Sequence, residues 1–85
     1  MREAVIGAWE DLKTARAIVD AAEDQTAAAQ VALDSVRNEV RVGQKPMLDL
    51  LDAQRSLLAA QVAQLAAKGD LVGAGYRLNA HLAAD

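Results

Sequence analysis

The sequence predicts an all-α fold, a long antiparallel two-helix coiled-coil hairpin. Three observations lead to this prediction. Apolar residues recur every seven positions through the first half, Gly43 and Pro46 interrupt the pattern, and a second set of heptad-spaced apolar rows fills the remainder. A heptad pattern sustained over several repeats is typical of a helix packed lengthwise against another helix. With 85 residues, the chain has room for one domain, a single hairpin over residues 1–85.

The first predicted helix spans about residues 3–41. Large residues dominate one row of its heptad and alanine dominates the other, and no proline interrupts either row. Small residues in one row allow a neighbouring helix to approach closely. The large row is Val5, Leu12, Val19, Thr26, Leu33 and Val40, and the small row is Ala8, Ala15, Ala22, Ala29 and Val36.

The predicted turn is the segment of residues 42–46, Val-Gly-Gln-Lys-Pro. Gly43 can adopt a positive φ angle and so end the first helix. Pro46 has a fixed φ and no N–H group, which suits the first position of the next helix. A connection this short makes the two helices antiparallel neighbours.

The second predicted helix spans about residues 46–82 and carries three small or apolar rows. An apolar face this wide exceeds what one partner helix covers, so we expect self-association into a helical bundle or a place in a larger helical wall. Three glycines near its end predict a bend or a close backbone contact. The rows are Leu51, Leu58, Leu65 and Val72; Leu50, Leu57, Leu71 and Leu78, interrupted by Gln64; and Ala53, Ala60, Ala67 and Ala74, and the glycines are Gly69, Gly73 and Gly75.

Composition excludes several classes of function. The net charge is -3, whereas a nucleic-acid-binding protein shows a basic stripe. Cysteine is absent, so neither disulfides nor thiol chemistry is expected. Ser35 and Ser56 lie in helical sequence without a histidine nearby, and His81 is the single histidine, so we expect no enzyme, no metal site and no cofactor. Met1 leads directly into helical sequence without a signal peptide or membrane-spanning run, which suggests a soluble, excised piece.

The turn and the residues after it resemble the TolC-like outer-membrane efflux protein family. In that family a valine-glycine turn is followed a few residues later by Asp-Val-Leu-Asp-Ala, and residues 49–53 here read Asp-Leu-Leu-Asp-Ala. The resemblance covers nearly the whole chain. Its flanking matches are Ala8-Trp9 and Ala15-Arg16-Ala17 before the turn, and Leu57-Leu58-Ala59-Ala60-Gln61 and Gly75-Tyr76-Arg77-Leu78 after it.

The resemblance implies a hairpin in the periplasmic α-barrel of a homotrimeric outer-membrane duct. Its tip would dock a periplasmic adaptor (membrane-fusion) protein, which links the duct indirectly to an inner-membrane pump. Residues near the tip would narrow the channel entrance. By this match the docking tip is Val42, Gly43, Gln44, Lys45 and Pro46, and the constriction residues of the full-length trimer are Lys45, Asp49 and Asp52.

Simpler interpretations remain open at these positions. Asp49 and Asp52 lie in the first turns of a helix, where carboxylates complement the helix dipole. Lys45 is equally well explained as an exposed turn residue, or as the partner of a carboxylate on its own or a neighbouring chain. Family turns often carry threonine or serine where this chain has Pro46, and often an aromatic residue where it has Val40.

Two other functions are open on the sequence alone. The first is a stand-alone structural coiled-coil hairpin that acts as an oligomerisation module, and its wide apolar face favours this. The second is an amphipathic helix on a membrane surface, which the acidic charge balance opposes.

Overall fold

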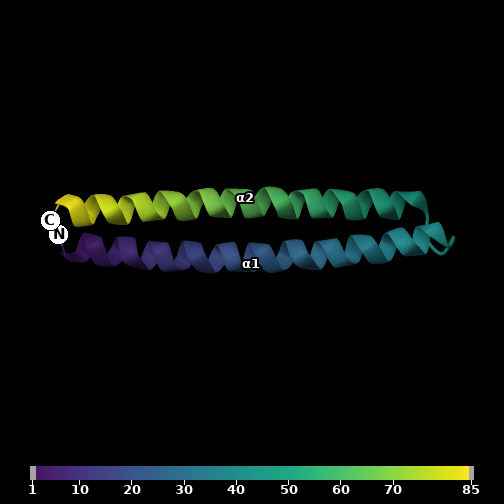
Figure 1. The fold of residues 1–85 in the computed structure, drawn as a ribbon, viewed down its shortest axis with the longest axis horizontal. Helices are drawn as coiled ribbons and strands as arrows, with labels where there is room; N and C mark the ends of the chain where they lie inside the picture. The colour runs from purple at the N-terminus through teal and green to yellow at the C-terminus, as the bar shows by residue number, and fades with distance from the viewer. Residues whose placement is uncertain (1, 85) are drawn as a thin grey trace.

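A computed structural model describes residues 2–84, which form two long antiparallel helices side by side (Figure 1). Helix α1 spans Arg2–Arg41 and helix α2 spans Met47–Ala84. No strand occurs within residues 2–84. The hairpin is a rod with Cα extents of 64 × 13 × 12 Å, and its turn lies at the end opposite to the start of α1 and the end of α2. The predicted all-α hairpin is confirmed.

The helix bounds lie close to those expected from sequence. Helix α2 begins at Met47, so Pro46 lies just before the first helical residue, and its carbonyl accepts a hydrogen bond from the Asp49 N–H at 3.0 Å. Differences of one or two residues at helix ends are ordinary. Helix α2 also continues through its three glycines to Ala84 without interruption. Packing on α1 explains this continuity, because Ala74, between two of the glycines, is only 1% exposed.

The two helices meet along a seam that we call the inner seam. All eleven heptad residues predicted for α1 are buried or half-buried in it, which confirms the assignment of that face. Val19 and Ala22 of α1 form a buried cluster with Ala67 of α2, and Leu71 packs against this cluster. The α2 side of the inner seam consists of Leu50, Ala53, Leu57, Ala60, Gln64, Ala67, Leu71, Ala74 and Leu78.

The side chains in the inner seam are small. Of the eight buried apolar residues in the described chain, six are alanine, and the other two are Val19 and Leu33. Small side chains let the backbones approach, and the Thr26 hydroxyl lies 2.9 Å from the Ala22 carbonyl of its own helix and 3.2 Å from the Ala60 carbonyl of α2. This hydroxyl, which has one hydrogen to donate, is thus satisfied within the seam.

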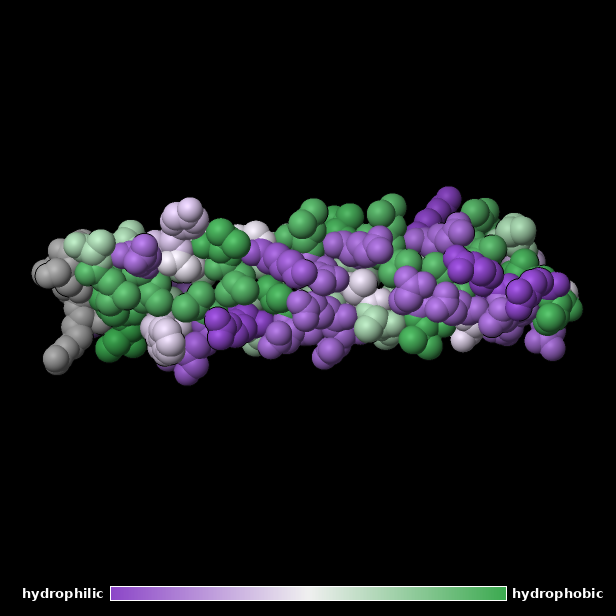
Figure 2. Space-filling view, in the orientation of Figure 1, coloured by the Kyte–Doolittle hydropathy of each residue, from purple (hydrophilic) through white to green (hydrophobic). Residues whose placement is uncertain are grey.

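One apolar row of α2 is left outside the inner seam. We call it the outer row, and its side chains are between 46% and 73% exposed. Figure 2 shows hydrophobic side chains interspersed with hydrophilic ones over the surface of the rod. The wide apolar face predicted for α2 therefore exists, but α1 covers only part of it. The outer row consists of Leu51, Leu58, Leu65 and Val72.

Candidate functional site

The candidate site is the turn at the end of the rod. Gly43 has a φ of 81° and is the one residue of the described chain with a positive φ. Its N–H donates to the Val40 carbonyl at 3.0 Å, and the N–H of Gln44 donates to the Glu39 carbonyl at 2.7 Å. These two bonds form a Schellman motif, in which a left-handed residue ends a helix and satisfies its last carbonyls. The turn therefore has a fixed backbone shape.

Glu39 binds the turn through both its backbone and its side chain. Its carbonyl also accepts the Lys45 N–H at 3.3 Å, and its carboxylate lies 3.5 Å from the Lys45 Nζ. The carboxylate partner of Lys45 within its own chain is therefore Glu39. Both side chains are more than one-third exposed, so the ion pair contributes less than about 1 kcal/mol.

The surface around the turn combines apolar and charged groups. Val42 is 66% exposed, and Met47 and Leu48 at the start of α2 are 59% and 62% exposed. Gln44 and Pro46 are exposed beside them, and Lys45 is half-buried. We call residues 42–48 the tip. Exposed apolar side chains around a cation are a composition suited to contact with another protein.

Asp49 and Asp52 lie in the first two turns of α2. Asp49 is half-buried and Asp52 is exposed, and neither has an ion-pair partner among the described residues. Residues three apart share one face of a helix. Small side chains continue this face away from the tip. We call the strip the carboxylate flank, and it consists of Asp49, Asp52, Ser56, Ala59 and Ala63.

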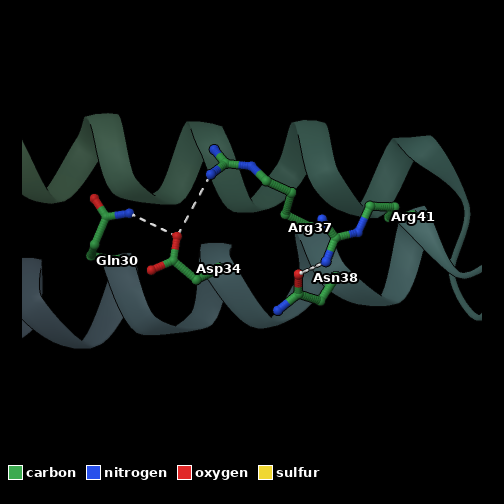
Figure 3. Close-up of polar contacts among 5 residues, drawn as sticks. All are labelled: Gln30, Asp34, Arg37, Asn38 and Arg41. Atoms are coloured by element: carbon green, nitrogen blue, oxygen red, sulfur yellow. Dashed lines mark hydrogen bonds and ion pairs between the residues drawn. The ribbon is translucent and has the colours of Figure 1, made fainter.

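Polar contacts in α1 near the turn are local to that helix (Figure 3). Asp34 accepts a hydrogen bond from Gln30 at 3.2 Å and lies 3.7 Å from the Arg37 guanidinium, and Arg41 donates to Asn38 at 2.8 Å. Such pairs, three or four residues apart, support a helix by a few tenths of a kcal/mol each, on the order of 0.2–0.5. The part of the chain described here contains no cluster of three metal-ligating side chains.

The turn should respond differently from the shaft of the rod to the same substitution. Gly43→Ala is expected to destabilise the hairpin by about 1–2 kcal/mol, because a side chain disfavours the left-handed conformation. Gly69→Ala in α2 is expected to stabilise it by about 0.5–1 kcal/mol. A new Cβ would meet no heavy atom within 4 Å at either position, so backbone conformation alone separates the two. Urea unfolding followed by circular dichroism measures the change in the free energy of unfolding for both variants. If the two substitutions changed it in the same direction, the positive φ of Gly43 would be contradicted.

Comparison with known proteins agrees with this arrangement. The sequence profile of the family described as "Outer membrane efflux protein" matches residues 2–84. The chain belongs to the outer membrane efflux protein family. The resemblance inferred from the turn is thereby confirmed, and an efflux family is a family of transport proteins rather than of enzymes.

A curated member of the outer membrane efflux protein family is similar over most of the chain. The outer membrane efflux protein BepC of Brucella suis biovar 1 (strain 1330) is 49% identical over 78 residues, which cover 92% of this chain and 17% of BepC. The chain thus spans about one-sixth of the length of this relative. No solved structure gives a significant match. Within residues 2–84, neither helix combines the length and the apolar character needed to cross a bilayer.

The predicted site residues of this efflux-protein hairpin all lie at the turn or in the first turns of α2. The five residues of the predicted docking turn lie together at one end of the rod, with Asp49 and Asp52 directly behind them on α2. Lys45 is directed to Glu39 of α1. Sequence reasoning missed Glu39 and the exposed pair Met47 and Leu48. The available signal for Glu39 was an acidic residue in the last turn of a helix that ends at a glycine.

Proposed function

We propose that this hairpin is part of the periplasmic wall of an outer-membrane efflux duct. Its tip docks a periplasmic adaptor protein, which connects the duct to an inner-membrane pump, and Lys45, Asp49 and Asp52 line the channel entrance. Two observations carry the proposal together. The chain belongs to the efflux family, and it forms a 64 Å rod whose turn lies at the end opposite to the start of α1 and the end of α2. In this proposal the rod presents its turn to the adaptor. In this proposal the assembled duct is a homotrimer.

The geometry of the tip supports docking. Four backbone hydrogen bonds hold residues 42–45 to the last turn of α1, so little conformational freedom is lost on binding. The exposed Val42, Met47 and Leu48 provide apolar contact area. The Lys45 amine beside them provides a charge that favours an acidic group on the adaptor.

The position of the carboxylate flank supports its role at the entrance. On α2, this flank is displaced by one residue from the inner seam, which is about 100° around the helix. Displacing the inner seam by a second residue in the same direction gives positions that include the outer row. If helices cover both apolar sides, the flank between them remains open to solvent. Two carboxylates from each of three copies would form a ring of six, which attracts cations and disfavours anions.

A binding assay with a charge reversal tests the docking role. The chain is mixed with the coiled-coil hairpin of a periplasmic adaptor from the same source, and Lys45→Glu is expected to weaken binding by at least about tenfold, because it removes a cation from the contact surface. Circular dichroism should show unchanged helicity. The matched control is Lys68→Glu, since Lys68 forms a comparable exposed pair, 3.9 Å from Glu23, on the shaft of the rod.

The outcomes separate the two candidate functions. Equal losses for Lys45→Glu and Lys68→Glu, or no loss for either, would place docking elsewhere than the tip. A chain that binds no adaptor but sediments as a stable helical assembly would favour the oligomerisation module instead. The observation that favours this second candidate is the exposed outer row of α2.

A further inference from the structure

The two long faces of the hairpin, on either side of the inner seam, carry different side chains. On each helix, one face is formed by the residues one position before the seam residues, and the other by those one position after them. Asp11 of α1 and Asp70 of α2 line a common groove, so the rows before the seam share one face. Glu23 of α1 and Lys68 of α2 pair at 3.9 Å on the other face, which the rows after the seam form.

The rows before the seam form what we call the small face. Along the shaft, from Thr14 to Ser35 of α1 and from Ser56 to Ala66 of α2, this face has no charged residue. Fourteen large apolar side chains are exposed among the described residues, and Ile18 is the one that lies in these rows. The charges of the small face lie at its two ends. Its surface along the shaft is mostly alanine, namely Ala21, Ala28 and Ala32 of α1 and Ala59, Ala63 and Ala66 of α2.

The opposite face is bulky and charged over the same length. It carries the outer row of α2, whose side chains are between 46% and 73% exposed. It also carries two ion pairs, Arg37 with Asp34 at 3.7 Å and Lys68 with Glu23 at 3.9 Å. The hairpin is therefore a two-sided ribbon, and the difference between its sides extends along both helices.

We propose that the small face is the inner wall of the duct, so that α1 lines the bore together with α2. This inference rests on the proposed function, in which Asp49 and Asp52 line the entrance. These two carboxylates lie one position before Leu50 and Ala53 of the inner seam, so they are the tip end of the small face. The face that holds the entrance carboxylates then continues behind them as the wall of the bore.

The closure of a helical wall into a ring favours this orientation. Side chains on the inner side of a ring converge, whereas those on the outer side diverge, so small residues suit the inner side. Alanine also has no side-chain donor, acceptor or charge, so a wall of alanine offers a passing solute no polar side chain to bind. The bulky and charged face suits the outer side, where its side chains have room.

Spin-label distances test the proposal in the trimer assembled from a longer chain that carries this hairpin. The 85 residues contain no cysteine, so single cysteines can be labelled once any in the rest of the longer chain are replaced. Ala63→Cys and Ala28→Cys mark the small face on α2 and on α1. The matched controls are Gln61→Cys and Gln30→Cys, which lie two residues away on the opposite face and are also exposed.

Labels on the inner side of the wall lie nearer to the threefold axis than labels on the outer side. The two faces of a helix differ by about 10 Å in their distance from this axis, so equivalent labels on the small face should lie about 17 Å closer together than those of the controls. Circular dichroism confirms the helicity of each variant. Equal distances, or shorter distances for the controls, in a trimer that conducts ions in a planar bilayer would overturn the inference and leave the proposed function in place. A longer chain that forms no conducting trimer would overturn both.

Discussion

Leu33→Ala is expected to lower the free energy of unfolding of the hairpin by about 2–4 kcal/mol, the largest loss from any single truncation in the chain. Among the residues whose burial the structure describes, Leu33 is the largest of eight buried apolar side chains and is 4% exposed. Its neighbours are held at a spacing set by two long helices, so they can collapse little into the space left behind. Small single-core chains have about 3–5 kcal/mol of stability in total, so the substitution should remove a large part of the stability of the hairpin.

Urea unfolding at one fixed protein concentration measures this effect. The matched control is Val31→Ala, which truncates a side chain that is 66% exposed on the same helix. It should change stability by no more than about 0.5 kcal/mol. If the two substitutions were equally damaging, the inner seam would not be the source of the stability of the hairpin.

Replacement of Asp49 and Asp52 together by alanine should open the channel entrance. In a trimer assembled from a longer chain that carries this hairpin, the conductance for ions is expected to rise because the side chains that narrow the entrance are shortened. The preference for cations over anions should fall on the order of tenfold, because a ring of carboxylates concentrates cations locally. Conductance and reversal potential in a planar bilayer under a salt gradient measure both changes.

Asp70→Ala is the matched control for this experiment. Asp70 lies three heptads beyond Asp49 on the same side of α2, about 32 Å farther from the tip. The substitution Asp70→Ala should therefore leave the conductance and the ion preference of the entrance unchanged. If the double variant conducted like the unmodified trimer, the carboxylates would have no constriction role, while the docking role of the tip would be unaffected.

The inner face of α1 could be predicted completely, because only one set of heptad rows in that helix is apolar. Helix α2 offered three small or apolar rows, and periodicity alone could not decide which two face α1. The structure shows that the alanine row, with Ala60, Ala67 and Ala74 buried, lies in the seam, whereas the Leu51 row lies outside. The close approach of two backbones selects small residues for the contact, and this choice depends on both helices together.

In the turn, too, a feature set by one residue could be predicted from sequence, whereas a contact between distant residues could not. Gly43 could be predicted from its own chemistry, because a helix followed at once by its antiparallel partner requires a residue with positive φ. The Glu39–Lys45 pair could not, because it forms only after the Schellman motif brings two residues six apart to within 3.5 Å. The entrance role of Asp49 and Asp52 depends on other copies of the chain, so it stays a prediction.

The alanine-rich inner seam also determines how the hairpin responds to heat. The heat-capacity change of unfolding scales with the apolar surface that becomes exposed, and a core in which six of eight buried apolar residues are alanine exposes little of it. The stability curve of the isolated hairpin should therefore be flat, with a low enthalpy of unfolding and a broad melting transition. Covering the outer row would increase the heat-capacity change and sharpen the transition, so the width of the melt reports directly on assembly.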